Sequence, residues 1–404
     1  MNQLLRAAKL TEKVYWVGAV DWEIKNFHGY ATERGTTYNA YLIIDEKITL
    51  IDTVKAQFRD ELLARISSVI DPEKIDYIVS NHAEMDHSGC LSDMIKIVKP
   101  EKVFASPMGE KNLKAHFGSD LKIDVVKTGD SISLGADTLS FVETKMLHWP
   151  DSMITYLSGE KILFSQDAFG MHLAGLKLFA DEYPDYVIEW EASKYFANIL
   201  MLYASPILGV LDALPGLNLD IKFIAPDHGP VWRNNPGWII EQYRKWSVQK
   251  PEKHAIIVYD TMWESTETMA RSIADGVSST GVDVEIISLQ SRERSHVATM
   301  ALKSGALIIG SSTLNNNLLP SVADILTYLK GLRPLNKIGF AFGSYGWSGE
   351  AVKQINEYLQ ATNVELVCEG VRTKYVPDQA ALQACFDAGV VLGNKLIEKI
   401  DAGK

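Results

Sequence analysis

Four separate strand-like runs in the first part of the chain each lead to residues that can bind a metal ion. The run "KIDYIVS" enters "NHAEMDH", whereas "LSFVETKML", "KILFSQ" and "IKFIAPD" run into His148, Asp167 and His228. Side chains at strand ends sit on loops that a rigid sheet holds in place, so groups from distant parts of a chain can converge there. We therefore expect a fold in which these four strand ends meet at one site.

The candidate ligands combine imidazoles with carboxylates. They are His82, Glu84, Asp86, His87, His148, Asp167 and His228. Burying the acidic members beside imidazoles without a cation would leave uncompensated charge, at a cost of several kcal/mol. The alternative for the first cluster is a solvated polar loop that caps a helix starting near Leu91. The clustering favours a metal site.

The chain is too long for one ordinary core. Its 404 residues predict two domains, and the polar connector "RKWSVQKPEKH" places the boundary near residue 250. We expect a first domain over residues 1–250 and a second over 251–404. The net charge of −11 argues against nucleic acid as a partner. Three isolated cysteines, no signal peptide and no membrane-spanning run predict a cytoplasmic protein without a membrane partner.

The two predicted domains differ in strand pattern. "TYNAYLIIDEKITLIDT" predicts two antiparallel strands at the start of the first domain, followed by a helix over about 58–70. After residue 250, "HAIIVY", "DVEIISL", "GALIIGS", "KIGFAFG" and "VELVC" alternate with helical stretches. This alternation is typical of a parallel sheet covered by helices on both faces.

Three loops of the second domain follow strands of that sheet and form a candidate cofactor site. The first runs from Asp260 to Ser265 into a helix near Thr266, whose start can bind a phosphate. An ordinary capped helix is the alternative. The loops starting at Gly310 and Phe342 should converge with it, because carboxyl ends of strands in such a sheet share one crevice. The candidate contacts are Thr261, Met262, Trp263, Ser265, Thr266, Ser312, Thr313, Asn315, Asn316, Asn317, Ser344, Tyr345, Gly346 and Trp347.

Both halves resemble known folds. "HAEMDH", with His148, Asp167 and His228 downstream, resembles the metal-binding pattern of the metallo-β-lactamase fold, an αβ/βα sandwich with the signature H-x-H-x-D-H. Glu84 stands where the zinc hydrolases carry their second histidine. A carboxylate is a harder donor than imidazole, so the set favours redox-active iron over zinc. The three loops of the second domain resemble those of flavodoxin, a doubly wound parallel sheet, which implies FMN.

Together the halves resemble the flavodiiron protein family, also called A-type flavoproteins. The segments "WVGAVDWEIKNFHGY", "GTTYNAYLI" and "MLHWPDSM" carry the resemblance further. It implies that one iron takes His82, Glu84 and His148, that the other takes Asp86, His87 and His228, and that Asp167 bridges them. In some members the histidine equivalent to His87 is turned away, which leaves its role open. His28 and Tyr195 are expected beside the substrate pocket.

The resemblance also implies an activity and partners. Dioxygen would be reduced to water, nitric oxide to nitrous oxide, or both, in a head-to-tail homodimer or a dimer of such dimers. Because the chain lacks a C-x-x-C pair after the flavodoxin-like part, the electron donor is expected to be separate. Rubredoxin is the first choice and a reduced deazaflavin coenzyme the second. Two other functions stay open: a zinc hydrolase, and an electron carrier or redox sensor with a structural metal cluster.

Overall fold

The computed structural model describes residues 5–403 and divides into two compact units. The first unit runs to Tyr195 and resumes from Ser205 to Arg244, and the second consists of Phe196–Ala204 and the chain from Lys245 onward. The boundary thus lies at Arg244, close to the predicted residue 250, but the short stretch Phe196–Ala204 of the predicted first domain belongs to the second unit. The physical reason lies in Asn198, whose side-chain amide donates to Ser295 O at 3.2 Å and accepts from the Tyr328 hydroxyl at 2.8 Å, both in the second unit.

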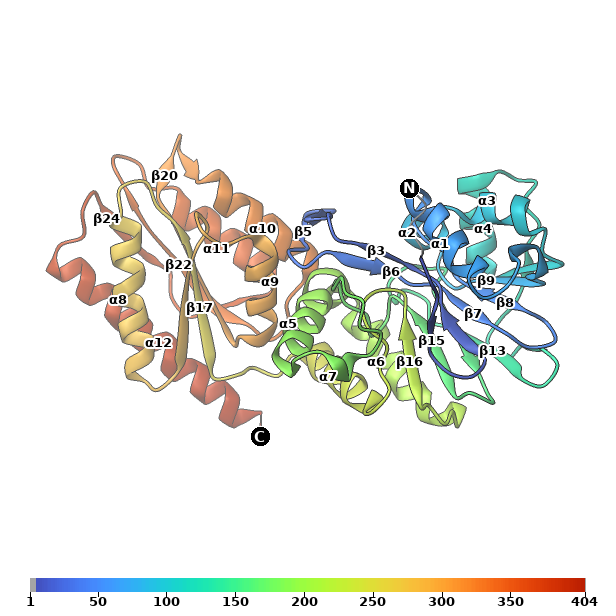
Figure 1. Ribbon diagram of the computed structural model, residues 1–404. Coiled ribbons are helices and arrows are strands. Elements are labelled where there is room, and N and C mark those ends of the chain that lie inside the picture. Colours follow the sequence, from blue (N-terminus) through green and yellow to red (C-terminus); the bar gives the residue numbers. More distant parts are fainter. Residues whose placement is uncertain (1–4, 404) are drawn as a thin grey trace. The chain divides into compact units, whose positions relative to one another are not determined.

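The first unit is built on two stacked sheets (Figure 1). The seven-stranded sheet has the order β1 (Ala8–Lys9), β2 (Val14–Trp16), β7 (Tyr41–Ile43), β8 (Thr49–Ile51), β9 (Tyr77–Ser80), β10 (Lys102–Ala105) and β11 (Asp124–Val125). The five-stranded sheet has the order β12 (Ser131–Ser133), β13 (Thr138–Glu143), β14 (Met153–Leu157), β15 (Ile162–Gln166) and β16 (Phe223–Pro226). The predicted antiparallel opening is confirmed, because β7 pairs with β8 with Leu42 opposite Leu50.

Apolar side chains fill the space between the two sheets. Tyr41 and Phe104 of the first sheet and Phe141 and Phe164 of the second belong to one buried cluster, in which the Tyr41 and Phe164 rings lie 5.2 Å apart. A second cluster on the outer face of the seven-stranded sheet includes Leu62 of α1. Burial on both faces explains why the central strands are apolar throughout.

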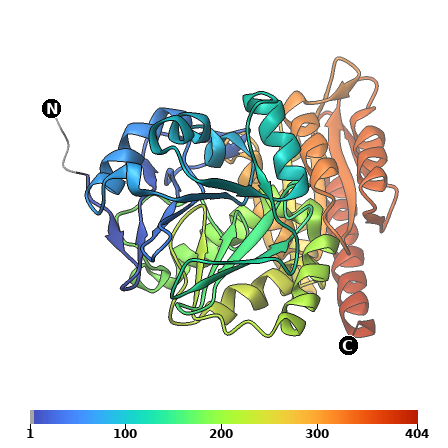
Figure 2. The ribbon, with the colours of Figure 1, turned by 90° about the vertical axis from the view of Figure 1, so that its right-hand side faces the viewer.

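Helices cover the outer faces of the sandwich. In Figure 2 the blue helices lie above the sheets of this unit and the yellow-green helices below. The helices are α1 (Arg59–Ser67), α2 (Met85–Ser88), α3 (Leu91–Val98), α4 (Pro107–Phe117), α5 (Asp185–Tyr195), α6 (Ala204–Ala213) and α7 (Pro236–Val248), with short η1 (Ala56–Phe58), η2 (Pro72–Lys74), η3 (Ala180–Glu182) and η6 (Leu214–Leu217). The short η4 (Phe196–Leu200) and η5 (Met201–Tyr203) lie in the stretch that belongs to the second unit. The predicted αβ/βα sandwich is confirmed. Two small hairpins complete the unit, β3 (Ala19–Asp21) with β6 (Thr36–Tyr38), and β4 (Asn26–Phe27) with β5 (Tyr30–Ala31).

The second unit is a parallel sheet between two layers of helices (Figure 1). Its strands follow the order β18 (Asp283–Ser288), β17 (His254–Asp260), β19 (Ala306–Ser311), β22 (Ile338–Tyr345) and β23 (Glu365–Leu366), and β24 (Val371–Lys374) also pairs with β22. Helices α8 (Ser265–Ser279) and α12 (Gln379–Ala402) cover one face, and α9 (Arg294–Lys303), α10 (Pro320–Leu332) and α11 (Ala351–Ala361) the other. The hairpin β20 (Thr313–Leu314) and β21 (Asn317–Leu318) follows β19. The predicted doubly wound sheet is confirmed.

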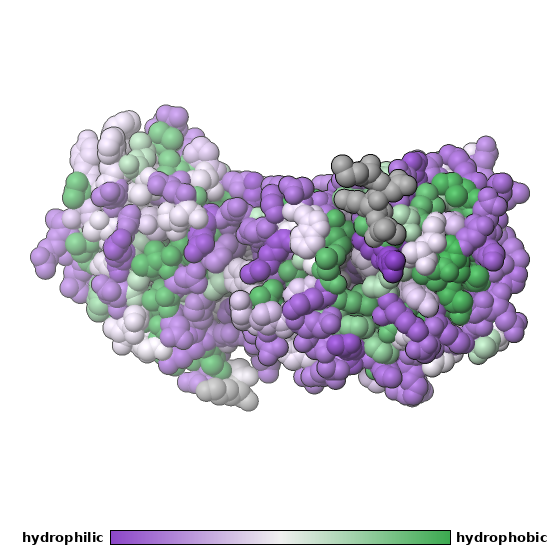
Figure 3. Space-filling model, in the orientation of Figure 1, coloured by the Kyte–Doolittle hydropathy of each residue, from purple (hydrophilic) through white to green (hydrophobic). Residues whose placement is uncertain are grey.

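Two helical stretches, Asp185–Leu217 and Gln379–Ala402, are long and apolar enough to cross a membrane by length and composition. The first is not one regular helix, since the π-helical η4 and the 3₁₀ turn η5 separate α5 from α6. The second is α12, whose Cys385, Leu392 and Leu396 are buried in the core of the second unit. Core helices of globular proteins meet the same test, so these stretches carry no separate conclusion. On the face drawn in Figure 3, hydrophobic residues are scattered among hydrophilic ones.

Candidate functional site

The ends of β9, β15 and β16 deliver most of the candidate metal ligands to one place. His82 and Glu84 follow β9, and the short helix α2 then presents Asp86 and His87. Asp167 comes directly after β15, and His228 comes two residues after β16. His148 differs from expectation, because β13 ends at Glu143 and a loop carries the chain on to the histidine. All four segments nevertheless meet, as predicted.

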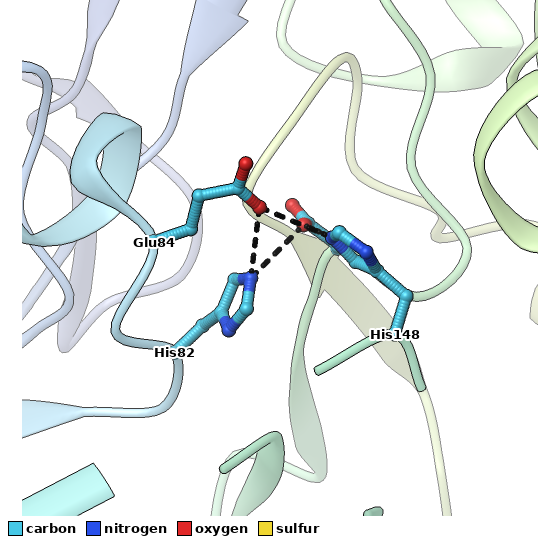
Figure 4. Close-up of side chains that lie close together, drawn as sticks. His82, Glu84 and His148 are labelled. Atoms are coloured by element: carbon cyan, nitrogen blue, oxygen red, sulfur yellow. Dashed lines mark hydrogen bonds and ion pairs between the residues drawn. The ribbon is translucent and has the colours of Figure 1, made fainter. Parts of the chain in front are cut away.

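The first group of donors consists of His82, Glu84, His148 and one oxygen of Asp167 (Figure 4). Glu84 Oε2 lies 3.2 Å from both His82 Nε2 and His148 Nε2. Asp167 Oδ2 lies 2.8 Å from His148 Nε2 and 3.5 Å from His82 Nε2. The three imidazole and carboxylate side chains labelled in Figure 4 point toward one another across a small gap.

The second group consists of Asp86, His87 and His228. His87 Nε2 lies 3.1 Å from His228 Nε2, and Asp86 Oδ2 lies 3.2 Å from the same His228 nitrogen. Asp167 presents its other oxygen here, with Oδ1 at 3.0 Å from His87 Nε2. Asp167 therefore lies between the two groups with one oxygen facing each. His87, whose orientation the sequence left open, turns its Nε2 toward the shared centre.

The spacing and bonding of these atoms fit a pair of metal ions. Bonds of about 2.1 Å to one ion place neighbouring donors about 3 Å apart, which is the separation found in both groups. Two imidazole nitrogens facing each other at 3.1 Å share at best one proton, whereas a cation could accept a lone pair from each. Asp86 Oδ1 is buried without a hydrogen-bond partner. Uncompensated groups of this kind are costly unless a ligand satisfies them.

Surrounding groups hold the imidazoles in orientation. His228 Nδ1 donates to Thr37 O at 2.6 Å, which leaves Nε2 with its lone pair toward the centre. For the other two imidazoles the neighbours are charges at ion-pair distance and not hydrogen-bond partners within the described residues: Asp151 Oδ2 lies 3.5 Å from His82 Nδ1, and Asp227 Oδ2 lies 3.6 Å from His87 Nδ1. Gly229 directly follows His228 at a φ of +76°, where a Cβ would meet Met171 O at 2.6 Å. The turn that carries His228 therefore requires glycine.

The electrostatics match a site built for cations. Burial raises the pKa of Asp167, but the positive charge of His87 and the hydrogen bonds from His148 and His87 lower it further, to well below its ordinary value. Burial lowers the pKa of His82, but the nearby carboxylates of Asp151 and Glu84 raise it well above that of a free imidazole. The pKa values of Glu84 and Asp86 are likewise lowered, and those of His87 and His148 are raised, because the opposite charges lie close together. Metal ions replace the protons of such histidines when they bind.

A wall of aromatic side chains lies beside the second group. Tyr195 and His172 are both buried, their rings lie 5.0 Å apart, and His172 lies 4.7 Å from His228. The predicted position of Tyr195 beside the site is therefore seen in the structure. His28 is more distant, since it is exposed and packs edge-on against Phe27, which in turn lies 5.1 Å from His172.

Sequence reasoning missed three residues of this centre. Asp227 directly precedes His228, Asp151 lies in the segment "MLHWPDSM", and His172 follows Asp167 by five positions. Their proximity in sequence to the ligands was the available signal. His172 Nδ1 lies 2.8 Å from Thr36 Oγ1, while its Nε2 is buried without a hydrogen-bond partner.

The second unit holds a pocket of about 540 Å³ at the carboxyl ends of its strands. Its lining comes from the three predicted loops and consists of Met262, Trp263, Ser265, Ser312, Thr313, Leu314, Asn315, Ser344, Tyr345, Gly346, Trp347, Tyr375 and Val376. Helix α8 begins at Ser265, and no side chain caps it. Its first N–H groups therefore favour an anionic ligand over the alternative of an ordinary capped helix.

The lining of this pocket and the predicted contacts overlap but are not identical. Thr261, Thr266, Asn316 and Asn317 are not among the lining residues of this pocket in the described chain. Thr266 supports the pocket from behind, because its buried hydroxyl lies 2.9 Å from Ser312 Oγ and 3.1 Å from Ser344 Oγ. Leu314, Tyr375 and Val376 were missed. Tyr375 and Val376 follow β24, a strand that the sequence pattern did not single out.

Known families and proteins match both units. A family model described as "ODP family beta lactamase" matches residues 36–229, and one described as "Flavodoxin" matches residues 257–389. A nitric oxide reductase of Moorella thermoacetica is 45% identical over 97% of this chain and 98% of its own length. The solved rubredoxin oxygen:oxidoreductase of Desulfovibrio gigas superposes with a TM-score of 0.96 at 42% identity, over 98% of this chain and 100% of that one.

The flavodiiron protein of Giardia intestinalis has a similar structure, with a TM-score of 0.95 at 35% identity over 100% of this chain and 99% of that chain. The resemblance thus extends over both units and, at these identities, goes beyond the fold. Such proteins contain a diiron centre and FMN. In this chain the two donor groups that share Asp167 fit the diiron centre, and the separate pocket of the second unit fits FMN. The chain belongs to the flavodiiron protein family of oxidoreductases.

Proposed function

We propose that this protein reduces dioxygen to water, nitric oxide to nitrous oxide, or both, at an iron pair in its first unit with electrons supplied through FMN in its second. The observation that carries the proposal is the position of Asp167, whose Oδ2 faces one group of donors and whose Oδ1 faces the other. A carboxylate in that position can bridge two ions. The names of the relatives from M. thermoacetica and D. gigas support the two substrates.

The donor chemistry supports iron. We assign His82, Glu84 and His148 to one ion, Asp86, His87 and His228 to the other, and Asp167 to both. Three carboxylates among the seven side chains make an oxygen-rich set that suits a redox-active metal better than zinc. When bound, the iron pair would supply open coordination positions and reversible electron transfer to a diatomic substrate.

Buried residues around the metal centre shield it from bulk water. His172 and Tyr195 are buried beside the second group and exclude bulk water from it. Reduction of dioxygen to two waters consumes four electrons and four protons, whereas joining two nitric oxide molecules into nitrous oxide and water consumes two of each. We assign the wall formed by Tyr195 to the substrate pocket and place His28 at its outer edge, behind Phe27.

The electron donor in this proposal is a separate redox partner. Rubredoxin is the first candidate, supported by the name of the D. gigas relative, and a reduced deazaflavin coenzyme is the second. We further propose a head-to-tail homodimer, alone or as a dimer of dimers. Trp263 and Trp347 line the FMN pocket yet are 86% and 85% exposed, and a second subunit would cover them. Unpaired Cys90, Cys368 and Cys385 support a cytoplasmic location.

Anaerobic purification followed by metal and flavin analysis tests the proposal. We expect an iron pair and one FMN for each chain, with dioxygen or nitric oxide consumed when reduced rubredoxin is added. Zinc in place of iron, together with hydrolysis of an ester or thioester, would instead support a metallohydrolase. Bound iron and FMN without turnover of either gas would support an electron carrier or sensor.

The bridge is tested by Asp167→Ala. We expect this variant to lose iron and gas consumption but to keep FMN, because the substitution leaves the second unit unchanged. Asp120→Ala removes an exposed carboxylate of the same unit and is the matched control. Full iron content in Asp167→Ala would show that the bridging role is misassigned.

A further inference from the structure

A small pocket in the first unit gathers positive charge that the proposed reaction does not use. It has a volume of about 170 Å³, and its lining includes the cationic side chains Arg6, Arg65 and Lys177. Thr37 and Gly229 also border it, on the backbone segments that hold His228. The pocket is smaller than the roughly 300 to 1,000 Å³ of sites for drug-sized ligands.

Arg65 is the central group of this pocket. It lies on α1 and is only 7% exposed. Its Nη1 donates to Arg6 O at 2.6 Å, and its Cζ lies 4.7 Å from the centre of the Trp16 ring. Among the described residues, its Nε is buried without a hydrogen-bond partner. The guanidinium thus lies close to the Trp16 ring with one donor left over.

Arg65 also has no ion-pair partner. Within residues 5–403, no carboxylate oxygen lies within ion-pair distance of it, and Glu61, one turn earlier on α1, is the acidic residue whose charge acts on it. Burial lowers the pKa of Arg65, but a guanidinium stays protonated at any physiological pH. A buried cation without a counter-ion costs far more than one cation–π contact recovers.

The other two cations extend the positive surface toward solvent. Arg6 and Lys177 are both exposed. Lys177 Nζ donates to Glu182 O at 2.7 Å and lies 5.5 Å from the centre of the Tyr183 ring, so its ammonium is held near the pocket by neutral groups. The chain has a net charge of −11, so a cavity lined by three cationic side chains has the opposite charge to the protein as a whole.

We propose that this pocket binds a small oxyanion, a carboxylate or a phosphate. Arg65 Nε donates to an oxygen of the anion, while Arg6 and Lys177 supply further charge. Arginine favours these ligands because its planar donors match the spacing of their oxygens, and hydrogen bonds between charged groups are about twice as strong as neutral ones. The site lies on the first unit alone and does not depend on the assignment of iron or FMN.

Calorimetric titration of the holoenzyme with inorganic phosphate, and separately with acetate, tests this proposal. We expect saturable binding of at least one of the two ions, and which ion binds more tightly decides between the phosphate and carboxylate forms. Arg65→Gln should weaken binding about tenfold or more, which corresponds to loss of one charged hydrogen bond. Arg59→Gln, on the same helix but paired with Asp60 and Asp93, is the matched control and should bind as the unaltered protein does.

A second variant keeps the test decisive if Arg65→Gln does not fold. Lys177→Gln alters an exposed side chain and should weaken binding without changing the melting temperature in anion-free buffer. Addition of the ion should raise the melting temperature of the unaltered protein more than that of either pocket variant. Absence of binding to the unaltered holoenzyme, or equal binding by Lys177→Gln and Arg59→Gln, would overturn the proposal.

Discussion

Asn39 connects the two sheets of the first unit at the point where His228 is held. Its side chain is 1% exposed and makes three hydrogen bonds. Oδ1 accepts from Trp16 Nε1 at 2.8 Å, and Nδ2 donates to Pro226 O at 2.7 Å and to Gly229 O at 2.8 Å. Asn39→Ala removes all three bonds and leaves a buried indole N–H and two carbonyls behind.

The expected loss of stability follows from these partners. Pro226 O keeps a second donor, because the Tyr41 hydroxyl also bonds to it at 2.7 Å. Trp16 Nε1 and Gly229 O lose the hydrogen bonds that Asn39 provides, and each unsatisfied buried group costs about 1–3 kcal/mol. We therefore expect a destabilisation of about 2–6 kcal/mol. In a unit of this size, that lowers the melting temperature by roughly 4–24 °C.

Calorimetric melting of the holoprotein, with iron content measured in parallel, checks this prediction. We expect iron content to fall as well, because Pro226 and Gly229 flank the segment that carries His228, while FMN content stays unchanged. Lys111→Ala truncates an exposed side chain on α4 of the same unit and should change stability by no more than about 0.5 kcal/mol. A melting temperature for Asn39→Ala within about 2 °C of the control would refute the reasoning.

Three further perturbations test other parts of the structure. Asp151→Asn should lower iron affinity about 10- to 100-fold in chelator competition, because its carboxylate orients His82, and unchanged affinity would contradict that role. Thr266→Val should weaken FMN retention, followed by flavin fluorescence, without altering iron, since its hydroxyl supports Ser312 and Ser344. Burial raises the pKa of Glu191 from 4.5 to about 7. Between these two pH values the folded protein keeps a proton that the unfolded chain releases, so the free energy of unfolding falls as the pH rises from 4.5 to about 7. Glu191→Gln should flatten this fall in melts between pH 5 and 8, and parallel curves for the two proteins would contradict it.

Much of the fold was predictable because apolar periodicity is local. The runs that became β17, β19 and β22 are largely continuous apolar segments, and burial on both faces of a parallel sheet demands such runs. The predicted strand ends were less accurate where tertiary contacts outweigh the local pattern. The run "LSFVETKML" was predicted to continue as a strand up to His148, but the strand ends at Glu143, and a loop brings His148 to Glu84.

The candidate sites were predictable to different degrees. Ligand types identified the metal centre, because a cluster of imidazoles and carboxylates has few other uses. The flavin pocket was less accessible to sequence reasoning. Thr266, a hydroxyl at a helix start, is expected to meet the ligand, and only the structure shows that its hydroxyl also contacts those of Ser312 and Ser344. Tyr375 was missed because its strand pairs with β22 across a long stretch of chain.

By itself the sequence determined which side chains could bind metal and flavin and which runs would be strands, since both depend on residue type and near neighbours. Only the tertiary structure decided how those side chains face one another. His87 and His228, 141 positions apart, approach to 3.1 Å, and the two oxygens of Asp167 separate toward two groups of donors. The same is true of the buried Arg65, whose Nε finds no hydrogen-bond partner within residues 5–403 because of what packs around it. Such contacts arise from the pairing and stacking of strands distant in sequence, which local patterns do not encode.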